Sequence, residues 1–293
     1  EKASMGLVTV SGSIGLLLPP STPVILFAIY AHTPIPDLFI GSLIPGILLV
    51  VAVSLWGARA GWLAGAPKIP FSLPEARSAI WNAKWDLLMP VVIAGGIFGG
   101  YTSPVEAAAV TVAYAFMVQC VIHKDLDMLK DLPRIGVESA TLVGGFLIIL
   151  SVALGLTNYL DYADVPVRAL AWVQSHVSSA AVFLLALNAF LIIVGALMDI
   201  YSAILVVVPL IIPIAAAYGI DPVHLGVVFL ANMELGYLMP PMGENLFLAS
   251  YRFNQPLGRI CLATAPFLVI ILIVVLLITY VPALTTAPVA WFQ

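Results

Sequence analysis

The stretch SGSIGLLLPPSTP, residues 11–23, decides how this chain folds, because it is apolar yet carries residues that break a helix. Pro19 and Pro20 have no backbone N–H group, and their rings clash with the preceding helical turn. Carbonyl groups around residues 13–16 are therefore expected to lose their helical partners. The stretch predicts two helices separated by a break that leaves backbone groups free.

The composition puts this break inside a membrane protein. Hydrophobic residues make up 62% of the 293 residues and charged residues only 9%, whereas soluble domains have roughly 45–50% and 25%. Apolar runs at 178–198 and 266–281 approach or exceed the ~18–20 residues that cross a bilayer. We therefore predict an all-α integral membrane protein with the lipid bilayer, and not nucleic acid, as its surroundings.

The two cysteines and four histidines predict no cofactor site. Cys120 and Cys261 lie in or beside apolar segments and have neither CxxC spacing nor a neighbouring histidine. The histidines are scattered over connections, and none is paired at helical spacing. A disulfide framework and a bound metal cluster are therefore not expected.

The expected helices follow the apolar runs, and no strand-like alternation competes with them. Residues 67–86 differ in kind, because three prolines precede Arg77 and Lys84, which stand beside Trp81 and Trp85. Basic residues flanked by tryptophan predict an interfacial arm helix, with a soluble loop as the alternative. The expected helices are 4–18, 21–31, 37–58, 87–99, 104–122, 136–160, 178–198, 202–218, 223–238, 243–252 and 260–281.

Residues 87–122 are expected to enter the membrane and return to the same side. Clusters of Lys and Arg flank this segment on both sides, and the positive-inside rule assigns both clusters to the cytoplasm. The sequence GGIFGGYTSP at 95–104 supplies the bend. Ser103 and Glu106 have the spacing of a capping box at the start of the second arm, which favours a structural role for Glu106.

The broken stretch has a partner 221 residues further along the chain, from Gly15 to Gly236. GLLLPPSTPVILFAIY at 15–30 aligns without a gap with GYLMPPMGENLFLASY at 236–251, and both Pro-Pro pairs coincide. Glycine- or proline-interrupted helices at matching positions in two halves point to the midplane binding site of a secondary transporter. Chance similarity of two apolar helices is the alternative.

Each break offers groups that can bind a cation and groups that can bind an anion. The carbonyl groups before Pro19 can coordinate a hard cation such as Na⁺. Beyond the break, Ser21 and Thr22 can cap a new helix, whose free N–H groups attract an anion.

The two halves are unequal in length. Helices at 136–160, 178–198 and 202–218 precede the second break, whereas about ten residues precede the first. We expect that the chain is the C-terminal two-thirds of a larger subunit, which the complete reading frame would test.

Polar residues inside the apolar segments are further candidates. Asp199 lies between two apolar arms, which form either two full spans or a re-entrant hairpin over 178–218. Glu234 is expected to face the cavity at the break, or to pair with Asn232, with Asn188 or with a cation. Asn245 follows the second break. In the alternative reading, such side chains only hold helices together.

Four ordered motifs together resemble the large membrane subunit of TRAP (tripartite ATP-independent periplasmic) transporters. They are GSIGLLLPPSTPVILFAIYA, GGIFGGYTSPVEAAAVTVAYA, MDIYSAILVVVPLIIPIAAAYGIDPVHLGVV and ELGYLMPPMGENLFLASYRF. The resemblance implies an inverted-repeat, elevator-type importer that is not an enzyme. It would use Na⁺ as coupling ion and carry organic anions such as C4-dicarboxylates, sialic acid or sugar acids across the bacterial inner membrane.

The family also implies partners and an organisation. A periplasmic substrate-binding protein delivers the anion, and a small four-helix membrane subunit braces the scaffold. Residues 1–66 would end the first repeat, 67–86 would form the arm, and 87–293 would form the second repeat. That repeat would contain the bent pair, the span 136–160, the hairpin 178–218, the broken helix 223–252 and the last span 260–281.

The resemblance assigns candidate binding residues to the two breaks and the hairpin tip. Met239 and Glu244 depart from the family pattern, in which a hydroxyl residue and an apolar residue are common. Na⁺ is expected on backbone carbonyls near Ser13, Gly15 and Gly236. The candidates are Ser11, Gly12, Ser13, Gly15, Pro19, Pro20 and Ser21 in the first half, and Asp199, Tyr201, Ser202, Asn232, Glu234, Gly236, Pro240, Pro241, Gly243 and Asn245 in the second.

Two other functions compete with this one. A related Na⁺/carboxylate symporter would work without a binding protein. An intramembrane hydrolase would use Asp199 and Glu234 as a carboxylate pair, but general acid–base chemistry requires the two groups to converge on one bond. The hydrolase hypothesis does not predict the repeat.

Overall fold

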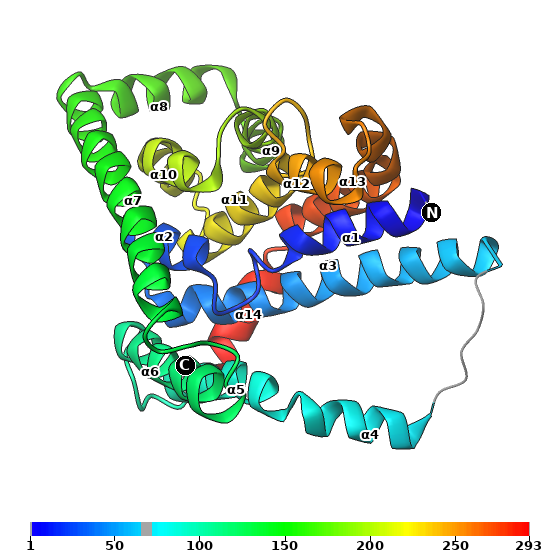
Figure 1. The fold of residues 1–293 in the computed structure, drawn as a ribbon. Helices are drawn as coiled ribbons and strands as arrows, with labels where there is room; N and C mark the ends of the chain where they lie inside the picture. Colours follow the sequence, from blue (N-terminus) through cyan, green and yellow to red (C-terminus); the bar gives the residue numbers. More distant parts are fainter. Residues whose placement is uncertain (1, 66–71, 293) are drawn as a thin grey trace. The chain divides into compact units, whose positions relative to one another are not determined.

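The structure, a computed structural model, describes residues 2–65 and 72–292 and is built from helices (Figure 1). No strand occurs among these residues, as the sequence predicts. Five of the described helices are long and apolar enough to cross a membrane. They are Ile35–Leu63, Pro104–Ile122, Ala180–Leu197, Ile200–Ala217 and Leu257–Tyr280.

The chain forms two compact units, one of residues 1–66 with 153–293 and the other of residues 67–152. The first unit contains both breaks and begins with α1 (Lys2–Ile14), α2 (Thr22–Tyr30) and α3 (Ile35–Leu63). Its later helices are α8 (Val165–His176), α9 (Ala180–Leu197), α10 (Ile200–Ala217), α11 (Pro222–Gly236), α12 (Glu244–Phe253), α13 (Leu257–Tyr280) and α14 (Ala283–Phe292).

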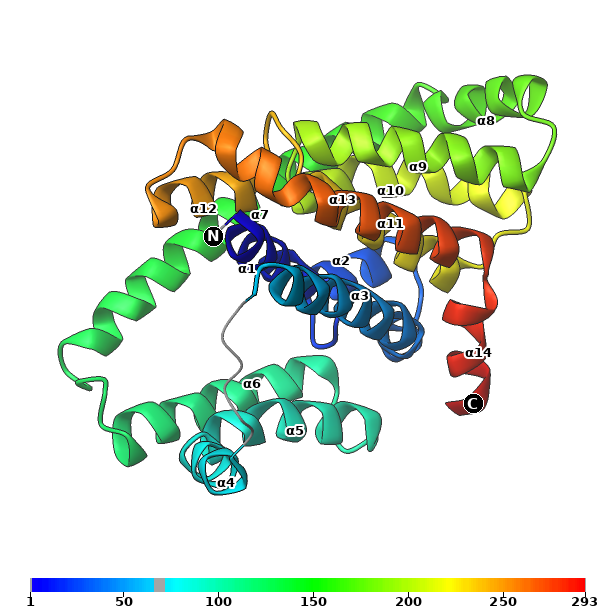
Figure 2. The same cartoon turned by 90° about the vertical axis from the view of Figure 1, so that its right-hand side faces the viewer.

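The helices around the two breaks correspond one to one. At the offset of the sequence repeat, α1, α2 and α3 match α11, α12 and α13. Their packing is reciprocal, because α1 packs on α12 and α13 while α11 packs on α2 and α3. Figure 2 shows α1, α3 and α13 beside one another in this unit. This exchange of contacts is the one expected of two copies related by a twofold axis.

Small side chains allow the two halves to approach closely. A Cβ atom on Gly226 of α11 would lie 2.7 Å from both Phe27 of α2 and Leu38 of α3. The rings of Phe27 and Phe229 lie with their centroids 5.5 Å apart across the same contact. The described side chains of α11 are buried almost along the whole helix, so α11 is the central helix of this unit.

The unit of residues 67–152 contains the predicted bent pair. Helices α5 (Lys84–Phe98) and α6 (Pro104–Phe116) are joined by a turn in which Gly100 has a φ of +69°. The predicted capping box is confirmed, because Ser103 and Glu106 exchange both hydrogen bonds. The π-helical segment Met117–Ile122 continues α6, and α7 (Asp131–Tyr162) includes the predicted span 136–160.

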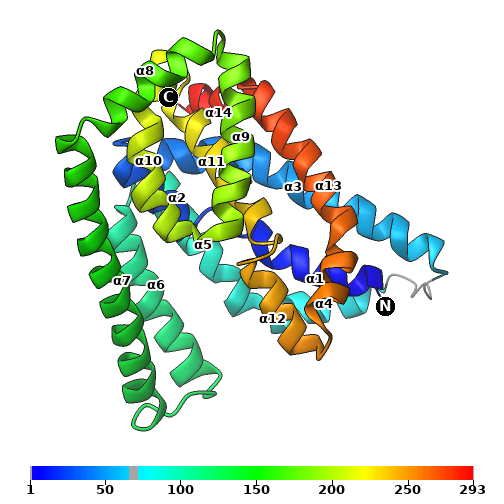
Figure 3. The ribbon, with the colours of Figure 1, turned by 90° about the horizontal axis from the view of Figure 1, so that it is seen from above.

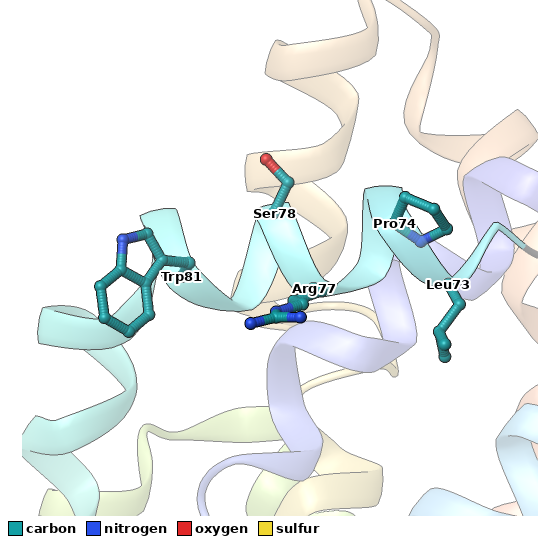
Figure 4. Close-up of a pocket in the computed structure, with 5 residues that line it drawn as sticks. All are labelled: Leu73, Pro74, Arg77, Ser78 and Trp81. Carbon is teal, nitrogen blue, oxygen red and sulfur yellow. The ribbon is translucent and has the colours of Figure 1, made fainter.

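The predicted arm contains α4 (Leu73–Asn82), while its residues 67–71 lie outside the described part of the chain. The Lys84 ammonium lies 4.1 Å from the centre of the Trp81 ring and 5.4 Å from that of Trp85. An open hollow follows α4 and is lined by Leu73, Pro74, Arg77, Ser78 and Trp81 (Figure 4). All five belong to one exposed helix, so the hollow is a surface feature of the arm.

The helices differ from the expectation in the end of the first one and in two that were not predicted. The first helix ends at Ile14, four residues earlier than the predicted residue 18, because the turn before Pro19 already departs from helical geometry. Helices α8 and α14 were not predicted. Helix α8 carries Arg168 and His176 within a mixed polar sequence, and α14 is a short segment interrupted by Pro288, so neither forms a long apolar run.

Candidate functional site

The first break connects α1 to α2 through residues 15–21. The Leu16 N–H donates to the Ser13 carbonyl at 2.9 Å, and the Ser21 hydroxyl donates to the Leu16 carbonyl. Ser21 occupies the N-cap position of α2, but its side chain makes no capping hydrogen bond. The prediction that Ser21 caps α2 is therefore wrong, because its hydroxyl bonds backward to a carbonyl that the prolines leave without a helical donor.

Free backbone groups of both kinds remain at this break. Among the described residues, no hydrogen bond reaches the carbonyl oxygens of Ile14 and Gly15. The N–H groups of Thr22 and Val24 at the start of α2 likewise donate to no described acceptor. The break thus offers oxygen atoms on the α1 side and N–H groups on the α2 side, which suit a cation and an anion respectively.

The serines of α1 are directed toward their own helix. Ser13 is buried and donates to the Val10 carbonyl at 2.9 Å, and the exposed Ser11 donates to the Val8 carbonyl at the same distance. Their hydroxyl oxygens keep lone pairs that can accept a hydrogen bond or contact a cation.

The second break, residues 237–243, is held against α9. The Met239 N–H donates to the Gly236 carbonyl, and the Met242 N–H donates to the Ala196 carbonyl of α9, each at 3.0 Å. A Cβ atom on Gly236 would lie 2.4 Å from the backbone of Gly195. Only glycine allows this approach. As at the first break, where Pro19–Pro20 is cis, the Pro240–Pro241 peptide bond is cis.

The predicted hairpin tip lies between the two broken helices. Helices α9 and α10 diverge from a connection of Met198 and Asp199 (Figure 3). Helix α9 packs on α11 of the second half, and α10 packs on α2 of the first half. The hairpin therefore contacts both halves of the repeat.

Asp199 caps α10 from this tip. Its Oδ1 accepts a hydrogen bond from the Ser202 N–H at 2.9 Å, and its Oδ2 accepts one from the Ser202 hydroxyl at 2.6 Å. Two predicted site residues are thus brought together, and the carboxylate occupies the positive end of α10.

A second carboxylate occupies the start of α12. Glu244 lies in the first turn of that helix and interacts electrostatically with Asp199, and its side chain is hydrogen-bonded to Tyr237. Tyr201 interacts with the same two carboxylates. The predicted site did not include Tyr237 or Glu244. The signal for Glu244 was its position next to Gly243, directly after the break.

Asn232 belongs to a network that joins three helices. Its side-chain amide donates to Asn188 Oδ1 of α9 at 2.6 Å and to the Val228 carbonyl at 2.8 Å. The Thr279 hydroxyl of α13 also donates to Asn188 Oδ1, at 3.2 Å. This geometry agrees with the alternative expectation that polar side chains hold these helices together.

Glu234 makes neither of the predicted pairings with asparagine. Asn232 and Asn188 bond to each other, and neither carboxylate oxygen of Glu234 has a hydrogen-bond partner among the described residues. The residue is 0% exposed. The hydrolase hypothesis requires Asp199 and Glu234 to act on one bond, yet the Asp199 carboxylate accepts its hydrogen bonds, among the described residues, from Ser202.

Asn245 connects the two halves at the start of α12. Its buried Nδ2 atom has no hydrogen-bond partner in the described part of the chain and would lie 3.7 Å from a Cβ atom on Gly12 of α1. A groove of about 210 Å³ runs along this contact between α1 and α12. Its lining residues are Val8, Thr9, Gly12, Asn245, Leu248, Ala249, Arg252 and Phe253.

Two matched breaks, packed reciprocally and joined by one hairpin, define a multi-pass membrane protein of the transporter class. Comparison with known families identifies it further. Residues 1–284 match the family described as the tripartite ATP-independent periplasmic transporter, DctM component. The chain belongs to this family and is a large permease component of a TRAP transporter.

Curated relatives agree with the family match. The C4-dicarboxylate TRAP transporter large permease protein DctM of Pseudomonas aeruginosa is 35% identical over 98% of this chain and 67% of its own length. The isethionate TRAP transporter permease protein DctMQ of Oleidesulfovibrio alaskensis is 32% identical over 96% of this chain and 44% of its own length. The sialic acid TRAP transporter permease protein SiaT of Haemophilus influenzae is 30% identical, over 96% and 46%.

The chain therefore spans about two thirds of the length of the first of these relatives and less than half of the length of the other two. The relatives are transport proteins, so the prediction of a transporter is confirmed and the hydrolase alternative is wrong. The predicted resemblance to the TRAP large subunit is likewise confirmed.

Proposed function

We propose that this chain forms the translocation pathway of a Na⁺-coupled importer of small organic anions in the bacterial inner membrane. A periplasmic binding protein would deliver the anion, and a small four-helix membrane subunit would complete the complex. The names of the relatives support an anionic substrate, because C4-dicarboxylates, isethionate and sialic acid are all acids.

The observation that carries the proposal is the meeting of two broken helices at one hairpin. Helix α10 contacts α2 beyond the first break, and α9 contacts α11 before the second. Na⁺ would bind carbonyl oxygens near Ser13 and Gly15 at one break and near Gly236 at the other. Those oxygens are neutral ligands, which suit a monovalent hard cation.

The substrate carboxylate would bind at the first break. Helix α2 begins with N–H groups that no described side chain caps. By contrast, Asp199 caps α10 and Glu244 lies in the first turn of α12. Two carboxylates near the second break would repel a bound acid, so the anion is expected at Thr22 and Val24, on the α2 side of the hairpin.

Elevator movement would carry the breaks and the hairpin together. Helix α9 is closely fitted to α11 through Gly195 and Gly236, and the Met242 N–H bonds to its end. A hairpin attached in this way would move with α11 as one body. The unit of residues 67–152, with its exposed arm helix α4, would then belong to the stationary scaffold.

Transport in proteoliposomes tests the proposal. The full-length subunit would be reconstituted with its small partner. Uptake of labelled succinate, isethionate and sialic acid would then be measured with and without a Na⁺ gradient, and with and without the binding protein. We expect uptake of at least one acid that requires both the gradient and the binding protein. Uptake that needs Na⁺ but no binding protein would favour the simpler symporter, and uptake indifferent to both would contradict the mechanism.

A further inference from the structure

Helix α4 presents apolar, aromatic and basic side chains on one face, which we call the basic face. Residues spaced three and four apart on a helix lie on the same side of it. The residues of the basic face with this spacing are Leu73, Arg77, Ile80 and Trp81. Those of the opposite face are Glu75, Ser78 and Asn82. Figure 4 shows Leu73 and Arg77 directed to one side of α4 and Ser78 to the other.

The apolar side chains of the basic face are open to the surroundings. None of the residues of α4 is buried. Leu73 is 72% exposed, Ile80 is 62% exposed and Trp81 is 68% exposed. Large apolar side chains that are exposed next to one another mark a surface that binds another protein or a membrane. The basic face of α4 is therefore a candidate binding surface.

Two cations stand at this face without a carboxylate partner. Arg77 is exposed and lies one helical turn before Trp81. Lys84 follows Trp81 at the start of α5, and its ammonium group lies 4.1 Å from the centre of the Trp81 ring. None of the ion pairs formed by the described residues includes either cation. Both side chains can therefore donate hydrogen bonds to an external anion.

A phospholipid matches this combination of side chains. Its phosphate group lies directly above apolar acyl chains, and tryptophan is enriched at that boundary. Amphipathic helices with basic residues lie in the same boundary, with their apolar side chains directed into the bilayer. A free phosphate ion would neutralise Arg77 and Lys84 but would leave Leu73 and Ile80 exposed to water. The lipid therefore fits the whole face, whereas the free ion fits only the two cations.

We propose that the basic face of α4 binds the headgroup of an anionic phospholipid. Arg77 and Lys84 would contact the phosphate oxygens on either side of Trp81, and Leu73 and Ile80 would lie against the acyl chains. A zwitterionic phospholipid brings its own cation, so it should bind more weakly. The sequence predicts only that the arm lies at the membrane interface, and the two unpaired cations add a preference for negatively charged lipid. The site is independent of the ion and the acid that are transported.

Photochemical labelling by lipids tests the site without any transport assay. The full-length subunit and its small partner would be reconstituted in vesicles of phosphatidylcholine with a minor fraction of phosphatidylglycerol. In parallel samples one of the two lipids would carry a photoactivatable group in an acyl chain, and lipid attached to the α4 peptide would be measured by mass spectrometry. We expect α4 to receive more phosphatidylglycerol than the share of this lipid in the bilayer. Added NaCl should reduce the excess, because salt screens the attraction.

Paired substitutions test which side chains produce the preference. In the Arg77→Gln, Lys84→Gln variant, labelling by phosphatidylglycerol relative to phosphatidylcholine should fall at least about fivefold, since each basic side chain near an anionic surface contributes about that factor. The Arg77→Lys, Lys84→Arg variant keeps both charges and should keep the preference. A matched control is Lys124→Gln with Lys130→Gln, which removes the same charge from a connection that also carries acidic residues. It should leave the labelling of α4 unchanged.

Four outcomes would overturn the proposal. The first is labelling of α4 by both lipids in proportion to their abundance, and the second is a preference that survives in the double glutamine variant. The third is the absence of both labels from α4, which would mean that protein or water covers the basic face. The fourth is a loss of labelling with inorganic phosphate that exceeds the loss with NaCl at equal ionic strength, which would assign the two cations to free phosphate. The NaCl series on the wild-type protein decides the question if the double variant does not fold.

Discussion

The two breaks share a sequence pattern and a cis Pro-Pro bond but have different surroundings. At the first break, α2 begins with uncapped N–H groups, and the Ser21 hydroxyl turns back to the Leu16 carbonyl. At the second break, α9 lies against Gly236, and Glu244 begins α12. The same interruption therefore leaves the helix start without a side-chain cap in one half and places a carboxylate at the helix start in the other.

Equivalent positions in the two breaks also differ in how closely they are packed. Gly15 and Gly236 are equivalent in the repeat, but a Cβ atom on Gly15 would meet no described atom within 4 Å, whereas one on Gly236 would overlap Gly195. The second break is fitted to its hairpin, and the first is accessible in the described part of the chain.

The largest expected effect comes from Gly236→Ala. The new methyl group would overlap the Gly195 backbone, and overpacking of this kind costs about 1–3 kcal/mol. We expect a lower unfolding temperature and a loss of uptake. Gly258→Ala is a matched control, because a Cβ atom there meets no described neighbour. Equal loss of stability in both variants would mean that the Gly195 contact does not hold the hairpin.

Removal of the prolines should have the next largest effect. Replacing Pro19 and Pro20 by alanine restores two N–H donors, so the carbonyls before the break regain helical partners. We expect Na⁺-dependent uptake to fall at least about tenfold, which corresponds to 1.4 kcal/mol. The matching change of Pro240 and Pro241 should do the same. Unchanged Na⁺ dependence in both variants would mean that the breaks only bend the helices and do not bind Na⁺.

Smaller losses of stability should follow from removing polar contacts at the breaks. Asp199→Ala removes the cap of α10, which costs about 1 kcal/mol, and Ser21→Ala removes one hydrogen bond, worth roughly 0.5–1.5 kcal/mol. Denaturant unfolding would measure both. If only Asp199→Ala also alters anion affinity, the anion lies at the second break and not at the start of α2.

The smallest expected effect is that of Glu244→Gln. The side chain is exposed, so its charge should act on a nearby anion with roughly 0.4–1 kcal/mol. We expect anion affinity to rise about two- to fivefold, and the change should shrink as ionic strength increases. Weaker binding of the anion in this variant would indicate that Glu244 contacts the substrate directly.

Much of the fold could be predicted because its signals are local. Runs of apolar residues marked α3, α9, α10 and α13, and the Pro-Pro pairs marked both breaks. The capping box of Ser103 and Glu106 was predicted because its spacing alone determines its geometry. Helices α8 and α14 were not predicted, since their sequences are short or mixed in polarity.

The site was predicted less completely, because its contacts join distant segments. Nothing next to Gly236 in the sequence indicates that Gly195 meets it, and nothing near Asn232 identifies Asn188 as its partner. The acceptor to which a hydroxyl group donates also depends on the tertiary structure. Ser21 has the residue type and position of an N-cap, yet its side chain bonds to the unpaired Leu16 carbonyl across the break.

The central claim is that the substrate acid binds at the start of α2, and labelling of introduced cysteines tests it most directly. Thr22→Cys and Glu244→Cys would each be made in full-length protein in which Cys120 and Cys261 are alanine. Modification by a charged thiol reagent would be followed with Na⁺ present, as an acid shown to be transported is added. If the acid binds at the start of α2, it should protect residue 22 and leave residue 244 reactive. Protection of residue 244 alone would contradict it.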